Sequence, residues 1–223
     1  MIRRLTAIIA LLSIVSCAAK STVAASILHF GPPYSTEGAG LTLSFPTILN
    51  STSYLYPLQH RYPPGDQKSP AIFNLFPCSG WFCKKEHAGK VTMHVSRLKT
   101  SDGSSEPTNE AHLRKRAALL YEQAERDRIL VTQQNSKSYP RLVLSSLSIS
   151  TIGDGLWAHF EQRNDNGQLT GAVYWRILGG DFTMSASYSM DLSMMPSGVT
   201  IEALDSSFND FVRQIRVAGM PKE

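Results

Sequence analysis

The chain has 223 residues, of which 42% are hydrophobic, and it carries 22 basic and 18 acidic side chains. A chain of this length can bury a full core, and one domain is the simplest count. Arg3 and Arg4 lie in a segment that we expect to be removed, which leaves 20 basic against 18 acidic side chains. This nearly neutral balance gives no indication of nucleic-acid binding.

The N-terminal segment has the features of a secretory signal. Arg3 and Arg4 give it a basic start, and residues 5–15 are apolar apart from Thr6 and Ser13. The run is too short for a permanent membrane-spanning helix, but it suits the hydrophobic region of a signal peptide. A buried first helix, which is the alternative, explains the leading arginines and the missing polar face less well. We therefore expect an exported protein.

Residues 14–17 have the sequence I-V-S-C and resemble the lipobox of bacterial lipoproteins. This resemblance implies that the signal peptide, residues 1–16, is cut just before Cys17 and that Cys17 carries acyl chains, palmitate among them. A thiolate is the side chain nucleophilic enough to accept the lipid, and several acyl chains hold a protein firmly at a membrane. The alternative is ordinary cleavage after Ala18, which would discard Cys17.

The residues that follow Cys17 concern the anchor and its location. Ala18 and Ala19 come next, without the aspartate that retains many such lipoproteins at the inner membrane, so we expect the outer membrane and its periplasmic face. Residues 17–26 are small and polar and form the expected tether. Residues 27–223 would then be a single periplasmic domain.

The first part of this domain, residues 31–89, is rich in proline, and we expect it to be largely irregular. One short strand is predicted at residues 41–45, where Leu41, Leu43 and Phe45 alternate inward.

The remaining two cysteines, Cys78 and Cys83, lie in the sequence FPCSGWFC. In an oxidising compartment they are expected to form a disulfide, since a loop this short closes readily. Their spacing differs from the C-x-x-C of thiol oxidoreductases, so a redox role is the weaker interpretation. The loop is a candidate partner-binding site, and its candidate residues are Trp81, Phe82, Lys84 and Lys85. Alternatively, the two rings pack into the core.

The regular part of the domain spans residues 90–217. A strand is predicted at residues 90–98, with Val91, Met93 and Val95 on one face. Residues 110–128 predict a surface helix whose apolar stripe contains Leu113, Ala117, Leu120 and Ala124.

Four strand-like segments follow, at residues 142–152, 155–163, 168–178 and 182–190, and the Asn-Gly pair of residues 166–167 indicates a hairpin turn between two of them. In the last segment one face is apolar (Phe182, Met184, Ala186, Tyr188 and Met190) and the other is rich in hydroxyls. A closing helix is predicted from the spacing of Ile201, Leu204, Phe208, Phe211 and Ile215.

These patterns predict an α+β fold, an antiparallel sheet of about five to six strands covered on one face by the middle helix and the C-terminal helix. The order of elements, from LTLSFP to FVRQIRV, resembles the PsbP-like superfamily over residues 40–217. That resemblance implies a similar fold and a non-enzymatic adaptor that binds other proteins. The proline-rich part and FPCSGWFC depart from the family pattern.

The sequence contains no strong catalytic signature and no metal-ligand spacing, so we expect no catalytic residues, no metal and no cofactor. His94 and His159 lie in the middle of predicted strands and could meet across the sheet, although two ordinary surface histidines are the simpler interpretation.

A small exported lipoprotein without enzyme motifs also resembles the immunity proteins that neutralise effectors delivered to the periplasm. We therefore expect a lipid-anchored module that binds another protein in the periplasm, through its sheet face or through the disulfide loop. An accessory lipoprotein of envelope assembly or secretion is the alternative within this class. An envelope hydrolase is the alternative of another class.

Overall fold

The computed structural model describes residues 27–77, 87–97, 110–134, 143–179 and 182–219, with the side chains of the long helix described up to residue 126. The elements in chain order are β1 (Phe30–Gly38), β2 (Leu41–Ile48), β3 (Ser51–Leu55), β4 (Gln67–Pro77), β5 (His87–Arg97), α2 (Glu110–Gln134), β6 (Val143–Leu144), β7 (Ser148–Ile152), β8 (Gly155–Arg163), β9 (Leu169–Gly179), β10 (Phe182–Met190), the 3-10 turn η1 (Leu192–Met194), α3 (Ile201–Gln214) and β11 (Arg216–Gly219).

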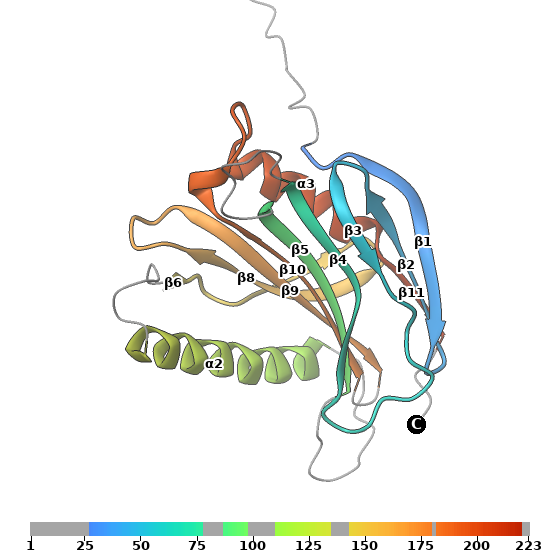
Figure 1. The fold of residues 1–223 in the computed structure, drawn as a ribbon. Coiled ribbons are helices and arrows are strands. Elements are labelled where there is room, and N and C mark those ends of the chain that lie inside the picture. The colour runs from blue at the N-terminus through green and yellow to red at the C-terminus, as the bar shows by residue number, and fades with distance from the viewer. Residues whose placement is uncertain (1–26, 78–86, 98–109, 135–142, 180–181, 220–223) are drawn as a thin grey trace, which may run out of the picture.

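The strands form two antiparallel sheets. The main sheet has eight strands in the order β3-β4-β5-β10-β9-β8-β6, with β7 also paired to β8. The small sheet has the order β1-β2-β11. The α+β class and the antiparallel sheet are thus confirmed, but the main sheet is larger than predicted and a second sheet accompanies it (Figure 1).

The prediction that residues 31–89 are largely irregular is wrong, because β1 to β4 and the start of β5 lie in this part. The prolines sit where a missing N–H is tolerated. Pro33 follows a register shift in β1, an edge strand, and Pro70 lies within the register shift between β4 and β5. Pro46 lies in β2 beyond the residues that pair with β11. The inward alternation of Leu41, Leu43 and Phe45 is confirmed, since all three are buried.

Contrary to the prediction, the two helices cover opposite faces of the main sheet (Figure 1). Helix α3 belongs to the large core, with Leu204, Phe208 and Phe211 fully buried. Helix α2 places Leu113 and Ala117 against Ala158 in a separate, smaller cluster. Helix α2 contacts β8 and β9, while α3 contacts β9 of the main sheet and β2 of the small one.

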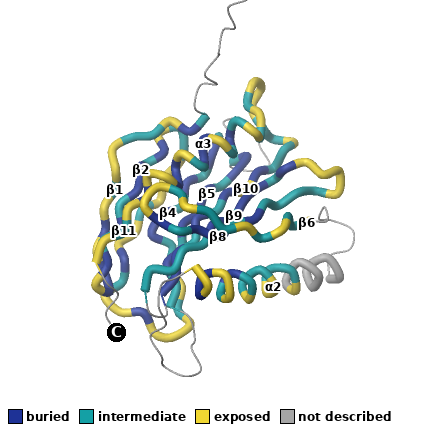
Figure 2. Tube along the Cα trace, turned by 180° about the vertical axis from the view of Figure 1, so that it is seen from behind, coloured by how far each residue is buried: buried dark blue, intermediate teal, exposed yellow. Residues whose placement is uncertain are grey.

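The two helices lie on opposite faces of the main sheet because β8 and β9 are apolar on both faces. In β8, Trp157 faces the large core and Ala158 faces α2. In β9, Tyr174 faces the large core and Trp175 faces α2. A strand that is apolar on both sides needs cover on both sides. Figure 2 shows buried residues along β5, β10 and β9, the strands at the centre of the main sheet. No helix in the described part of the chain is long and apolar enough to cross a membrane.

Candidate functional site

Seven residues named from the sequence fall outside the described ranges, and what was expected of them stays a prediction. They are the lipid site Cys17, the disulfide pair Cys78 and Cys83, and the loop candidates Trp81, Phe82, Lys84 and Lys85.

The two mid-strand histidines do not meet. His94 lies on β5 between Met93 and Val95, which both face the large core, so its ring is on the opposite face of the sheet. His159 lies on the large-core side of β8, where its ring stacks on Tyr174 with the ring centroids 5.0 Å apart. Strands β10 and β9 also lie between β5 and β8. The two rings therefore cannot form a joint catalytic or metal site.

His159 has a serine partner but lacks an orienting carboxylate. The Ser148 hydroxyl lies 2.9 Å from its Nε2 and 3.4 Å from its Nδ1. Burial lowers the pKa of His159, and the negative charges of Asp205 and Glu161 offset part of this lowering. Within the described chain no carboxylate hydrogen-bonds to the ring, whereas a catalytic Ser-His pair needs a group that fixes the other ring nitrogen. This arrangement does not favour the hydrolase alternative.

The polar groups beside His159 anchor α3 to the sheet. The Tyr188 hydroxyl donates to Asp205 at 2.8 Å, and the Tyr174 hydroxyl donates to Asn209 at 3.0 Å. Burial raises the pKa of Tyr174 to about 12 and raises the pKa of Asp205. Both tyrosines are almost fully buried, and each finds its hydrogen-bond acceptor on α3, as buried hydroxyls require. We assign this cluster a structural role.

The face of β5 and β10 that points away from the large core is polar, and we call it the hydroxyl face. It consists of four cross-strand pairs in direct register: Lys90 with Ser189, Thr92 with Ser187, His94 with Ser185, and Ser96 with Thr183. The pairs alternate with the core residues of the same strands, among them Met93 and Ala186. No carboxylate occurs among these eight side chains.

No helix covers the hydroxyl face in the described chain, because α2 packs on β8 and β9 instead. Six of its eight side chains are partly or fully exposed, while Thr92 and Thr183 are buried. At one end, Ser96, Thr183 and Ser185 border a groove of about 300 Å³ whose walls include Leu120 of α2 and Trp175 of β9.

The centre of the hydroxyl face is His94. Its Nδ1 lies 2.7 Å from the hydroxyl of Ser69 on β4. Burial lowers the pKa of His94, and the positive charge of Lys90 lowers it further. At neutral pH the ring is therefore uncharged, and Lys90 carries the positive charge of this face.

The lowered pKa of His94 predicts that the protein loses stability on acidification. The unfolded chain binds a proton on His94 near pH 6.5, before the folded protein does, so the free energy of unfolding falls as the pH drops from about 7 through the folded-state pKa. Asp205 acts in the opposite sense, because its raised pKa favours proton uptake by the folded state.

The His94 contribution is isolated by comparing variants. His94→Gln should reduce the loss of melting temperature between pH 7.5 and 5, whereas His60→Gln, at an exposed histidine, should leave the pH profile unchanged. Equal profiles for His94→Gln and the wild type would contradict the assignment.

The sequence indicated only part of this site. The hydroxyl alternation of β10 was predicted, but the partner strand β5 and the register that places Lys90 beside Ser189 were not. Lys90 was not named as a site residue, and the signal that points to it, a lysine in strand alternation with Thr92 and His94, is visible in the sequence. Among the described residues, no group of three or more His, Cys, Asp or Glu is placed to bind a metal ion.

Comparisons with known proteins include a structural similarity. No family model and no curated protein matches the chain. The solution structure of cyanobacterial PsbP (CyanoP) from Synechocystis sp. PCC 6803 matches with a TM-score of 0.49 and 12% identity, over 90% of this chain and 99% of that one. A similarity of this size assigns neither a family nor a function.

Proposed function

We propose that this protein is a non-catalytic binding module of the bacterial envelope that holds another protein on its hydroxyl face. The observation that carries this proposal is the open face itself, four register pairs of hydroxyl, imidazole and ammonium groups without a carboxylate or a covering helix in the described chain. From Lys90 to Ser96 the hydroxyl face extends over six residues of β5, which is about 20 Å. This length suits the centre of an interface of standard size.

The chemistry of the face suits a protein partner better than a reaction. Hydroxyls supply both donors and acceptors and bond readily to backbone and side-chain groups of another chain. His94 is paired with Ser69 rather than with a carboxylate, so the face lacks the oriented acid-base pair that hydrolysis needs.

The lipid anchor is part of the proposal, and Cys17→Ser tests it. This change should release the protein from membranes or block its processing, because the thiolate that accepts the acyl chains is gone. Fractionation and the N-terminal residue of the mature protein provide the measurement. A wild-type protein that is soluble and begins at Ala19 would overturn the lipobox interpretation.

The specific version that we propose is an immunity lipoprotein that neutralises an effector delivered to the periplasm. A neighbouring gene for a secreted hydrolase or toxin, and protection of the cell from that effector, would support this version. An envelope-assembly or secretion partner would support the accessory role within the same class.

The docking surface is tested by affinity purification of the full-length protein from its own envelope in mild detergent, with Ser187→Glu run in parallel. A partner that co-purifies with the wild type and is lost from Ser187→Glu supports the hydroxyl face. A partner retained equally by both would place the interface elsewhere.

A further inference from the structure

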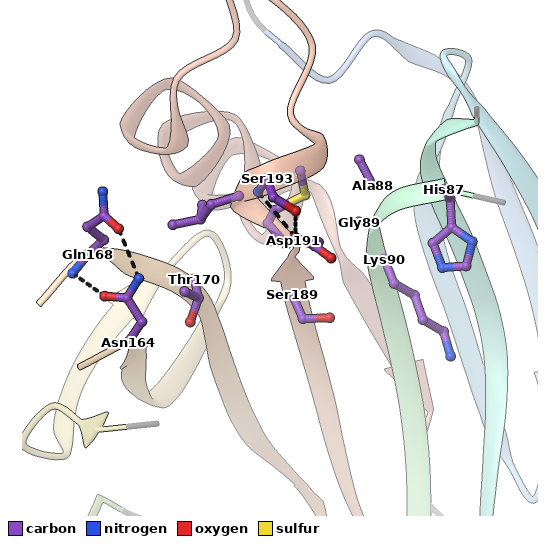
Figure 3. Close-up of a pocket in the computed structure, with 12 residues that line it drawn as sticks. His87, Ala88, Gly89, Lys90, Asn164, Gln168, Thr170, Ser189, Asp191 and Ser193 are labelled. Atoms are coloured by element: carbon purple, nitrogen blue, oxygen red, sulfur yellow. Dashed lines mark hydrogen bonds between the residues drawn. The ribbon is translucent and has the colours of Figure 1, made fainter. Parts of the chain in front are cut away.

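A cavity of about 660 Å³ opens at the end of the hydroxyl face that carries Lys90 and Ser189 (Figure 3). It lies where β5 and β10 approach the β8–β9 turn and η1. The polar lining comes from His87 and Lys90 of β5, Ser189 and Asp191 around the end of β10, Ser193 of η1, and Asn164, Gln168 and Thr170 of the turn and β9. This volume lies within the range typical of ligand sites in proteins.

The described lining also has an apolar part, which consists of Ala88, Met190 and Leu192. Gly89 makes room for Met190, since a Cβ at that position would overlap the sulfur of Met190. The site therefore combines apolar and polar lining residues, which suits a group with a short aliphatic stem and a polar head.

Among the described residues, the polar lining carries one positive charge, on Lys90, and one negative charge, on Asp191. Within the described chain, Lys90 has neither a hydrogen-bond nor an ion-pair partner. Ser189 is its cross-strand neighbour, and in Figure 3 the Ser189 side chain points toward the strand that carries Lys90. The Nδ1 atom of His87 is buried without a hydrogen-bond partner. Asp191 is the one carboxylate among the described residues that line the cavity, and it accepts hydrogen bonds from the backbone N–H and the hydroxyl of Ser193 at 3.2 and 2.6 Å.

An ammonium group and hydroxyl donors beside apolar lining residues complement a carboxylate on an aliphatic stem. We infer that this cavity receives a glutamate or aspartate side chain of the partner protein that docks on the hydroxyl face. The inference rests on the proposed function and adds the chemistry of the contact, an acidic anchor at the Lys90 end. A lysine binds a carboxylate as a compact charge with rotatable donors, so the hydroxyl of Ser189 would fix its position.

The test uses a pair of probes that differ only in the side chain. The full-length protein in detergent micelles is titrated with N-acetylglutamate methylamide and with N-acetylglutamine methylamide, while the backbone amide signals are followed by NMR. The glutamate probe should shift the amides of Lys90, Ser189 and Ser193 with millimolar saturation, and the glutamine probe should bind at least fivefold more weakly. Equal binding of the two probes, or shifts confined to other residues, would overturn the inference.

Two variants and a second anion complete the test. Lys90→Gln should weaken the glutamate probe at least fivefold without changing the melting temperature, and Lys68→Gln, at an exposed lysine that does not line the cavity, should bind as the wild type does. Inorganic phosphate that binds tenfold more tightly than the glutamate probe would overturn the carboxylate assignment.

The inference and the proposed function can fail separately. A partner that is lost from Ser187→Glu but retained in full by Lys90→Gln would leave the docking face in place and remove the acidic anchor. Loss of the partner from Lys90→Gln, with the melting temperature unchanged, would support the anchor.

Discussion

Phe208→Ala should lower the free energy of unfolding by about 3–5 kcal/mol, the typical cost of truncating a buried phenylalanine. Phe208 is fully buried, and its ring lies 4.9 Å from Tyr188, 5.6 Å from Tyr174 and 5.8 Å from Phe211. It joins α3 to the main sheet, so its loss leaves a cavity at the contact that holds the helix in place. The loss is a large part of the stability of a typical domain.

Denaturant unfolding of the purified protein measures this effect. Leu49→Ala is the matched control, because Leu49 is 66% exposed and its truncation should change the free energy of unfolding by no more than about 0.5 kcal/mol. Equal melting of Phe208→Ala and the wild type would contradict the role of α3 as the cover of the large core.

The elements whose inward face the sequence predicted correctly are apolar on one face only. In β5 and β10 the apolar residues recur at every second position, and in α3 they recur at every third or fourth. Such periods are local properties of the chain and can be recognised in a single sequence. The inward positions of Val91, Met93 and Val95 were predicted for this reason, and all are buried.

The predictions that were wrong concern features that depend on tertiary contacts rather than on the local sequence. The proline content of residues 31–89 predicts irregular structure, but an edge position and register shifts accommodate Pro33 and Pro70 in strands. The consecutive aromatic residues Tyr174 and Trp175 indicate a strand buried on both faces, which was not recognised, and so both helices were predicted on the same side.

The candidate site was only half predicted for a related reason. The hydroxyls of Ser185, Ser187 and Ser189 follow from the alternation within β10. Their pairing with β5, which lies far earlier in the chain, depends on strand order and register, and neither is a local property of the sequence. The cavity at Lys90 depends on that same pairing.

Ser187→Glu should weaken partner binding about 100-fold while the melting temperature stays close to that of the wild type. Ser187 is directly opposite Thr92 near the middle of the hydroxyl face and is partly exposed. On docking, a glutamate at this position would lose the hydration of its carboxylate. It would also lie in the same interface as the acidic side chain that we propose the partner places at Lys90. An unpaired or like-charged group buried in an interface costs several kcal/mol, and about 2.7 kcal/mol corresponds to a factor of 100 in affinity.

Ser206→Glu is the matched control, because Ser206 is exposed on α3, on the other side of the main sheet. The same substitution on that side should leave the affinity for the partner unchanged. A loss of affinity in both variants would indicate a general effect of added negative charge and would count against a local interface.

The most direct measurement is the affinity of the captured partner, by calorimetry, for four full-length variants beside the wild type: Ser187→Glu, Ser206→Glu, Trp81→Ala and His159→Ala. The hydroxyl face predicts that Ser187→Glu binds about 100-fold more weakly and that Ser206→Glu and His159→Ala bind as the wild type does. Full affinity in Ser187→Glu together with a loss confined to Trp81→Ala would move the interface to the loop at residues 78–83. Loss of function in a folded His159→Ala protein would favour the hydrolase alternative and contradict the binding module.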